Sequence, residues 1–172
     1  MEAIITTATM LAMYFNVAAT NGGKYSYNAD VENNKVMNIE VLNQEGNYLS
    51  RKLQYRFSYD DQDRLSSKEA LKWNSIRQCW DHCYVLDYAY THGGYTVELR
   101  NWNNTRNDYA AATEKMDYQM IGSSVMAVNH YKMSKDKSGM ELASNVLVMN
   151  PQSGNILAMI GEMEKSGCGV ID

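Results

Sequence analysis

The sequence predicts an all-β protein, an antiparallel meander of repeated hairpins with about ten strands. Three observations support this prediction: a repeat of about 30 residues, alternation of apolar and polar residues, and polar turns between the alternating segments. We expect the sheet to be strongly twisted or curled, because a flat single layer would leave one aromatic face exposed to water.

The repeat is marked by residues that recur every 29 to 32 positions. The first mark is a pair of large side chains two positions apart, found at Tyr25/Tyr27, Phe57/Tyr59, Tyr88/Tyr90 and Tyr118/Met120. A second mark follows each pair, at Val41, Trp73, Trp102 and Tyr131. Trp80 and Tyr109 form a third mark. A fixed period of this size indicates one supersecondary unit copied along the chain.

Each unit is predicted to contain two strands. Between Leu49 and Tyr59 apolar residues fill alternate positions, and only Arg51 breaks the alternation. The segment 80–90 places alternate residues on one face, namely Trp80, His82, Tyr84, Leu86, Tyr88 and Tyr90. Further strands are expected in the segments 65–73, 95–99, 125–131, 146–148 and 156–160. Trp102 is out of phase with the strand before it, which predicts a bulge or a strand end near Asn101.

Polar turns separate the predicted strands. They lie at residues 44–47, 60–63, 91–94, 103–107, 137–139 and 150–154. Gly, Asn and Asp tolerate the positive φ that hairpin turns require. The only proline, Pro151, also falls in a turn, where its missing N–H does no harm.

The 172 residues are predicted to form one repetitive β domain at residues 20–162, followed by a C-terminal tail at 163–172. Residues 1–19 are predicted to be a signal peptide, with Val17 and Ala19 at the small-residue positions before Thr20. Because no Lys or Arg precedes the apolar stretch, a structural helix or strand is the alternative. The stretch is too short and polar to predict a stable membrane span. The expected location is therefore secreted, periplasmic or in the cell envelope.

The charge pattern argues against nucleic acid as a partner. The chain has 16 basic and 20 acidic residues, a formal net charge of −4, and no basic stripe. No phosphate-binding loop or other cofactor motif is present in the sequence, so no cofactor is expected.

The leading functional hypothesis is a non-enzymatic binding module, because Tyr and Trp are abundant: 13 Tyr and 3 Trp, against only 2 Phe. Aromatic faces on a sheet stack on sugars or anchor protein partners. The candidate binding residues are Tyr59, Trp73, Trp80, Tyr84, Tyr88, Tyr90 and Trp102. Plain cross-strand packing is the alternative, with the rings of Trp73 and Trp102 packed over the neighbouring Tyr-x-Tyr strand. A second function is a structural or self-assembling envelope component, a homo-oligomer formed through edge strands.

Cys79, His82 and Cys83 bring three possible metal ligands into five residues, but zinc sites usually need a second pair of ligands at a distance. We therefore predict no metal. On a strand Cys79 and Cys83 would lie about 13 Å apart, too far for a disulfide, which needs about 4.4–6.8 Å between Cα atoms. Cys168 can reach either of them if the tail folds back.

The segment 148–161 resembles the first hairpin of penicillin-binding transpeptidase domains. Ser134 and Lys137 have the Ser-x-x-Lys spacing of that family, and Lys165-Ser166-Gly167 resembles its Lys-Thr-Gly element. The order of these motifs is reversed here, so we interpret the hairpin as a fifth copy of the repeat. A hydrolase or transpeptidase-like enzyme, with Ser134 and Lys137 or His82 and a cysteine, is the third hypothesis, and no catalytic residue is assigned.

The segment 55–65 resembles the tyrosine-aspartate repeat of Rhs-type shells, in which the position of Asp63 is a glycine. With the Lys-Trp-Asn and Trp units that extend to Trp80, residues 20–150 resemble more closely a family of small secreted proteins of unknown function from Bacteroides-like gut bacteria. This resemblance implies an extracytoplasmic all-β protein, and it implies no activity or catalytic residue.

Overall fold

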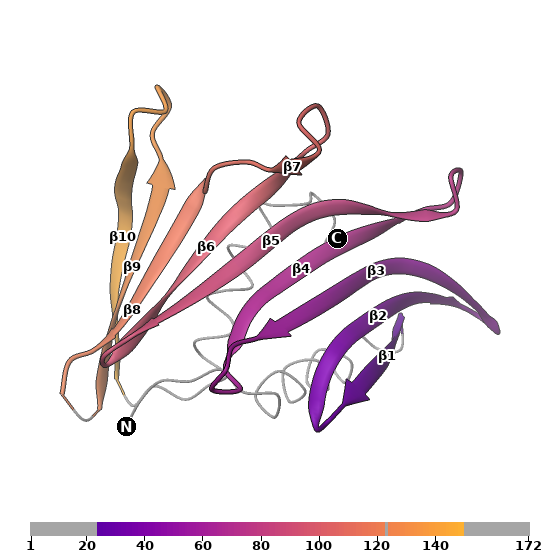
Figure 1. Ribbon diagram of the computed structural model, residues 1–172, viewed down its shortest axis with the longest axis horizontal. Coiled ribbons are helices and arrows are strands. Elements are labelled where there is room, and N and C mark those ends of the chain that lie inside the picture. Colours follow the sequence, from indigo (N-terminus) through magenta and orange to yellow (C-terminus); the bar gives the residue numbers. More distant parts are fainter. Residues whose placement is uncertain (1–23, 123, 150–172) are drawn as a thin grey trace. The chain divides into compact units, whose positions relative to one another are not determined.

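The computed structural model describes residues 24–122 and 124–149, and every regular element in them is a strand (Figure 1). The ten strands are β1 (Tyr25–Glu32), β2 (Lys35–Glu45), β3 (Tyr48–Tyr59), β4 (Leu65–Asn74), β5 (Cys79–Thr91), β6 (Gly94–Asn103), β7 (Asp108–Tyr109), β8 (Glu114–Met120), β9 (Val125–Met133) and β10 (Met140–Met149). The predicted signal peptide, the predicted tail, and the transpeptidase-like hairpin beyond Met149 lie outside the described residues. The described part contains no helix that is long and apolar enough to cross a membrane.

The strand order confirms the predicted antiparallel meander. Neighbours in the sheet follow the order β1-β2-β3-β4-β5-β6-β8-β9-β10, and the two-residue β7 pairs with β6. The pairs with a described register, for example β2–β3 and β8–β9, are antiparallel. Apart from β8, which pairs with β6 and not with β7, each strand therefore lies beside the one before it in the chain.

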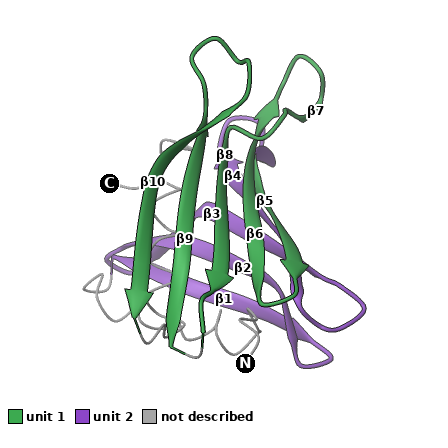
Figure 2. Ribbon diagram, turned by 90° about the vertical axis from the view of Figure 1, so that its left-hand side faces the viewer, with its two compact units in different colours: residues 1–4, 84–172 green, residues 5–83 purple. Residues whose placement is uncertain are grey.

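The chain divides into two compact units, and the boundary falls inside β5 between Cys83 and Tyr84 (Figure 2). Among the described residues, unit 2 contains β1 to β4 and the first residues of β5, and unit 1 contains the rest. Each unit has its own set of buried side chains. In unit 2 these are mainly aliphatic and aromatic residues of β2, β3 and β4: Val36, Ile39, Val41, Leu53, Tyr55, Phe57, Leu65, Ala70 and Leu71.

A β-bulge in β3 explains why Arg51 breaks the alternation. The pairs Val41–Leu53 and Leu42–Arg51 are consecutive on β2, so β3 contains one extra residue between them, Lys52. The bulge reverses which face the preceding residues of β3 occupy. Leu49, predicted to lie on the buried face, is therefore 57% exposed.

The core of unit 1 contains a ladder of tyrosines across three strands. Tyr95 stacks on Tyr118, with ring centroids 4.6 Å apart, and its ring is tilted against that of Tyr90 at 5.9 Å. Burial raises the pKa of Tyr95 and of Tyr118 above the usual value, because the charged phenolate loses its hydration. The Tyr118 hydroxyl donates to Met116 Sδ at 3.0 Å.

Of the two alternatives predicted near Asn101, a bulge or a strand end, β6 has no register shift against β5 and ends at Asn103, and the strand opposite is interrupted there. β6 pairs with β8 as far as Leu99 and Glu114, and with β7 at Trp102 and Tyr109. Residues 110–113 separate β7 from β8, held by hydrogen bonds from Ala110 N to Asn101 O and from Thr113 N to Leu99 O, both 2.9 Å. The break in the apolar alternation at Trp102 therefore corresponds to the point where the partner of β6 changes from β8 to β7.

The turn at residues 60–63 is held by the side chain of Asp60. Asp60 Oδ1 accepts hydrogen bonds from the backbone N–H groups of Gln62 and Arg64, and Asp60 Oδ2 accepts from Arg64 Nε at 2.8 Å. Asp63 has a φ of 61°. The turn therefore needs a residue that tolerates the left-handed conformation, and Asp is one of the few that do.

Candidate interaction surface

The seven predicted binding residues differ in their exposure. Tyr84 and Tyr88 are buried, so their side chains belong to the core of unit 1. The other five side chains are half-buried: Tyr59, Trp73, Trp80, Tyr90 and Trp102. Tyr59, Trp73 and Trp80 lie in unit 2, and the remaining four lie in unit 1.

Tyr59 has a structural role at the start of the 60–63 turn. Its hydroxyl donates to the backbone oxygen of Val36 at 2.9 Å, and the Lys35 ammonium lies over its ring, 5.6 Å from the centroid. Lys35 also forms an ion pair with Asp63. These contacts tie the 60–63 turn to the start of β2.

Trp73 and Trp80 form an edge-to-face pair at the ends of β4 and β5, with ring centroids 5.0 Å apart and ring planes at 67°. The guanidinium of Arg51, on β3, lies 4.7 Å from the centroid of the Trp73 ring. Arg51 Nε also forms an ion pair with Glu40 at 3.0 Å. One side of the Trp73 ring is thus occupied by a cation, an arrangement that is favourable for Trp.

The turn between β4 and β5 is held by Asn74. Its Oδ1 accepts hydrogen bonds from the backbone N–H groups of Ile76 and Arg77, at 3.2 and 3.0 Å, and its Nδ2 donates to Asp81 Oδ2 at 2.8 Å. Arg77 forms an ion pair with Asp81. The hydrogen bonds from Arg77 and Asn74 lower the pKa of Asp81, because they favour its charged form.

The turn between β6 and β7 repeats this arrangement 29 positions later in the sequence. Trp102 and Tyr109 meet edge to face, with ring centroids 4.9 Å apart and ring planes at 74°. Asn103 Oδ1 accepts hydrogen bonds from the backbone N–H groups of Thr105 and Arg106, at 3.0 and 3.1 Å. Both turns also place a residue with positive φ two positions before the second ring, Gln78 and Asn107 respectively.

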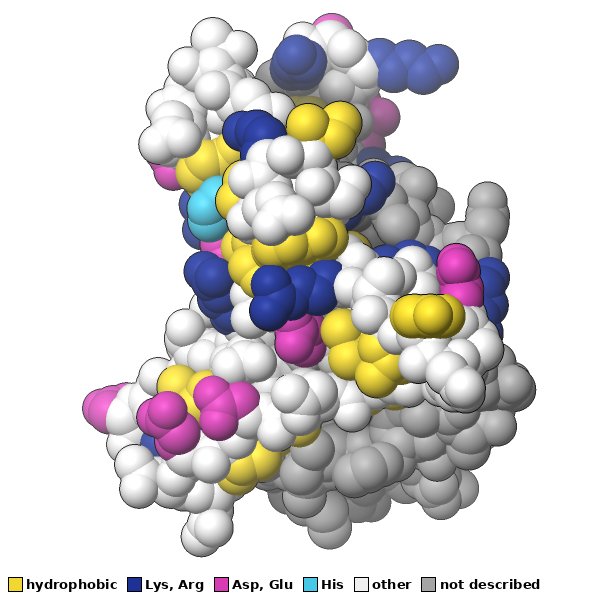
Figure 3. Space-filling view, turned by 90° about the vertical axis from the view of Figure 1, so that its right-hand side faces the viewer, with side chains coloured by type: hydrophobic (Ala, Val, Ile, Leu, Met, Phe, Trp, Pro, Cys, Tyr) yellow, Lys and Arg dark blue, Asp and Glu magenta, His cyan; other side chains and the backbone are white. Residues whose placement is uncertain are grey.

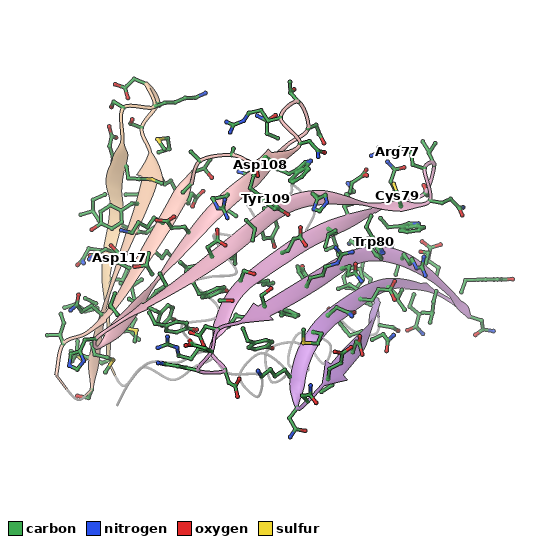
Figure 4. The ribbon with its side chains drawn as sticks, viewed as in Figure 1. Arg77, Cys79, Trp80, Asp108, Tyr109 and Asp117 are labelled. Atoms are coloured by element: carbon green, nitrogen blue, oxygen red, sulfur yellow. The ribbon has the colours of Figure 1, made fainter. Side chains whose placement is uncertain are left out.

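These ring contacts differ from the packing predicted for Trp73 and Trp102. Each of the two rings contacts the aromatic residue on the other side of its own turn, Trp80 and Tyr109 respectively. The prediction placed each ring over the Tyr-x-Tyr strand of a neighbouring unit instead. The two rings of each pair are seven positions apart and flank a four-residue turn, so the turn itself brings them together. Figure 4 shows Trp80 next to the β4–β5 turn and Tyr109 on β7.

Three exposed apolar side chains lie at the same end of unit 2 as the Trp73–Trp80 pair. Ile76 is 93% exposed, Tyr48 is 82% exposed and Leu49 is 57% exposed. Because β3 and β4 are antiparallel neighbours, the β2–β3 turn and the β4–β5 turn lie at one end of the unit (Figure 1). Figure 3 looks onto that side of the molecule, where hydrophobic side chains emerge between charged ones.

We name these residues the turn surface: Tyr48, Leu49, Trp73, Ile76 and Trp80, with Arg51 and Arg77. Tyr48 and Ile76 were not among the predicted site residues, and Leu49 was predicted to lie on the buried face. A signal for Ile76 is present in the sequence, since it is an isolated apolar residue in an otherwise polar turn. The corresponding residue of the second turn is Thr105, so the exposed apolar tip belongs to the first turn alone.

The candidate catalytic groups of the sequence are engaged in local hydrogen bonds. His82 Nδ1 lies 2.7 Å from Glu69 Oε1, whereas Cys79, which has a free thiol, directs its Sγ toward Asp81 Oδ1 at 3.7 Å. The structure therefore does not pair Cys79 with His82. In the described part of the chain, His, Cys, Asp and Glu side chains form no group of three or more that is suited to a metal ion.

Ser134 and Lys137 lie in one turn, which the Ser134 hydroxyl holds together. The Ser134 hydroxyl donates to Asp136 Oδ1 at 2.6 Å and accepts hydrogen bonds from the backbone N–H groups of Ser138 and Gly139. Lys137 has a φ of 60° and an exposed side chain, and its backbone N–H donates to Ser134 O at 2.9 Å. The Ser-x-x-Lys spacing here builds a hydrogen-bonded turn.

Comparison with known proteins gives a family but no activity. The sequence profile of a family of unknown function, DUF3836, matches residues 1–120. A protein of unknown function from Bacteroides fragilis NCTC 9343 has a similar structure, with a TM-score of 0.65 and 20% identity over 76% of this chain and 96% of that protein. A DUF3836 family protein from Bacteroides vulgatus ATCC 8482 has 28% identity over 50% of this chain and 88% of that protein, with a TM-score of 0.49. Comparison with curated proteins gives no match.

Proposed function

This chain belongs to the DUF3836 family of unknown function, and we propose that it is an extracytoplasmic, non-enzymatic module that binds a protein partner through the turn surface. The observation that supports this proposal is that one end of unit 2 carries three exposed apolar side chains, Tyr48, Leu49 and Ile76, and two half-buried tryptophans. Single exposed apolar residues are ordinary, but several of them at one end of a unit favour an interaction site.

The chemistry of the turn surface favours a protein over a carbohydrate. A sugar ring needs an open aromatic face, and one side of Trp73 is occupied by Arg51 while Trp80 meets its ring edge to face. The most exposed groups are the aliphatic side chain of Ile76 and the ring of Tyr48, which fit pockets on a protein. Tyr, Trp and Arg are also the residues in which protein interfaces are enriched.

The local hydrogen bonds make the turn surface suitable for binding. Asn74 fixes the backbone at Ile76 and Arg77, and Arg51 links the start of β3 to the end of β4. A partner would therefore meet a surface that is already ordered, which reduces the entropy lost on association.

The extracytoplasmic location is supported by the apolar segment 4–19 and the small residues before Thr20. Expression of the full chain in a Bacteroides host, followed by cell fractionation and N-terminal sequencing, tests this part. We expect a mature chain that begins at Thr20 in the periplasmic or secreted fraction. A chain that keeps Met1 and remains in the cytosol would contradict it.

The binding proposal is tested with a double variant, Leu49→Ser and Ile76→Ser. Its control is Val31→Ser, which removes an exposed apolar residue near the β1–β2 turn, at the opposite end of unit 2. Partners are captured from Bacteroides envelope extracts, and each one that is enriched is purified and titrated against the three proteins. We expect one partner whose affinity falls at least about tenfold for the double variant and is unchanged for the control.

The same titration separates the alternatives. A purified partner that binds all three proteins equally would contradict the turn surface as the binding site. Binding to soluble polysaccharides that is lost in Trp73→Ala but kept in the double variant would show a carbohydrate module instead.

A further inference from the structure

The β-bulge in β3 directs a lysine toward a tyrosine hydroxyl. Lys52, the extra residue of the bulge, donates from Nζ to Tyr25 Oη at 2.7 Å, across the intervening strand β2. The Lys52 ammonium lies 4.3 Å from the centroid of the Tyr25 ring, and the Lys24 ammonium lies 5.4 Å from the same centroid. Two cations therefore lie beside one phenol ring. Bulges often occur next to functional sites, where they re-aim a side chain.

A third lysine belongs to the same face of unit 2. Lys72 on β4 is the direct partner of Leu53, the residue after Lys52, and its side chain is exposed. Directly paired residues share a face of a sheet, and the row of pairs that ends at Lys72 begins at Tyr27, two positions after Tyr25. Tyr25 and Lys72 are therefore on the same side of the sheet.

The positive charge of this group is not neutralised by carboxylates. Neither Lys52 nor Lys72 forms an ion pair with the residues that the structure describes. The hydrogen bond from Lys52, and then the interaction with Lys24, lowers the pKa of Tyr25, because both cations favour the phenolate form. The space around the Tyr25 hydroxyl therefore favours negative charge. Lys24 is exposed and Tyr25 is half-buried, so solvent reaches the group.

We propose that Tyr25, Lys24, Lys52 and Lys72 form a binding site for a phosphate monoester. The Tyr25 hydroxyl accepts from Lys52 and donates its own proton to a phosphate oxygen, while the ammonium groups supply further N–H donors. A phosphate monoester has a second pKa of about 6 and is mainly a dianion at neutral pH. It therefore matches several cations better than a carboxylate or a sulfate ester, each of which carries a single negative charge.

This inference goes beyond the proposed function and does not depend on it. The phosphate site and the turn surface both belong to unit 2, but they have no residue in common. The double variant Leu49→Ser and Ile76→Ser should therefore bind phosphate as the wild type does. The same phosphate chemistry is presented by a lipid headgroup and by a small soluble ester, and the experiment includes both sources.

The test is an NMR titration of the purified protein with glycerol 3-phosphate at constant ionic strength. The variants are Lys52→Gln, Lys72→Gln and Tyr25→Phe, and the control is Lys135→Gln, which removes an exposed cation of unit 1. Circular dichroism checks that each variant keeps its sheet, and Lys72→Gln leaves the bulge unchanged. We expect binding to weaken about fivefold for each lost ammonium of the site, to weaken in Tyr25→Phe, and to stay unchanged in the control.

Co-sedimentation with phosphatidylcholine vesicles, with and without phosphatidic acid, distinguishes the two sources. Binding that requires phosphatidic acid and is weakened in Lys52→Gln would support the site and identify a lipid headgroup as its ligand. Binding of glycerol 3-phosphate without binding to these vesicles would support the site and identify a soluble ester. The proposal would be overturned if neither probe binds, if Lys135→Gln weakens binding as much as Lys52→Gln does, or if methyl sulfate binds as tightly as glycerol 3-phosphate.

Discussion

Trp73 and Trp80 meet edge to face across the turn that joins β4 to β5, with ring centroids 5.0 Å apart. Trp102 and Tyr109 repeat this relationship across the turn that joins β6 to β7, at 4.9 Å. Each pair therefore holds two neighbouring strands together next to the turn that joins them.

Replacing Trp73 by alanine should destabilise the protein by about 2–3 kcal/mol. Emptying a fully buried aromatic site costs about 3–5 kcal/mol, and Trp73 is only half-buried. The loss includes the contacts with Trp80 and with the Arg51 guanidinium. A urea melt monitored by circular dichroism measures the change. Trp73→Phe, which keeps a ring, should cost less than half as much, and an unshifted midpoint for Trp73→Ala would contradict a structural role.

Removing the asparagine of either turn should cost about 1–2 kcal/mol, because two backbone N–H groups lose their acceptor. We expect Asn74→Ala to cost more than Asn103→Ala, since Asn74 Nδ2 also donates to Asp81. Asn103→Asp keeps the acceptor for Thr105 and Arg106 and should be nearly neutral. Thermal melts of the three variants at one pH give the comparison. Equal costs for all three would show that the side-chain acceptor is unimportant.

Gly94→Ala should destabilise unit 1 by at least about 2 kcal/mol, because overpacking forces the backbone to move. A Cβ at Gly94 would lie 2.0 Å from the backbone oxygen of Tyr118, and β6 would have to shift away from β8. Gly139 is the control, since a Cβ there meets nothing within 4 Å and its φ is not in the left-handed region. Denaturant melts should show Gly139→Ala within about 0.5 kcal/mol of the wild type.

The folding stability of the protein should decrease as the pH falls, because of the turn around Asp136. Hydrogen bonds from Ser134 and then Ser138 lower the pKa of Asp136 to about 2, from 3.8. A carboxyl whose pKa is lower in the folded state contributes stability that is present above its unfolded pKa and is lost as the pH falls toward about 2. We expect the melting temperature of Asp136→Asn to decline less steeply than that of the wild type between about pH 4 and pH 2. Parallel curves for the two proteins would contradict this.

The fold could be predicted from the sequence because the patterns that specify it lie within single strands and turns. Alternation of apolar residues along β3 and β5 fixes which side of the strand is buried, and polar turns fix where the chain reverses. The equivalence of Trp73 and Trp102 was also visible, since both occupy the same place before an asparagine. A meander needs little long-range information beyond this, because every strand except β8, which pairs with β6, pairs with the strand before it in the chain.

The candidate site was harder to predict, because exposure depends on contacts that a sequence does not show. Tyr84 and Tyr88 have the same chemistry as Trp73 but are buried in the core. Leu49 is exposed because the extra residue Lys52 reverses the alternation, and a bulge of one residue leaves only Arg51 as its trace in the sequence. The Asn33-Asn34 turn between β1 and β2, with φ values of 50° and 61°, was missed although two consecutive asparagines suit it.

The turns at Asn74 and Asn103 have a consequence for how this fold can diversify. In each turn one asparagine side chain accepts hydrogen bonds from two backbone N–H groups, and one aromatic pair closes the turn. The side chains at the tip of the turn are therefore not needed to hold the sheet together. Ile76 in one turn and Thr105 in the other show how different those residues can be. The residues at the tips of the two turns can therefore change, and with them the partner that is bound, while the strands and the asparagine-aromatic arrangement stay the same.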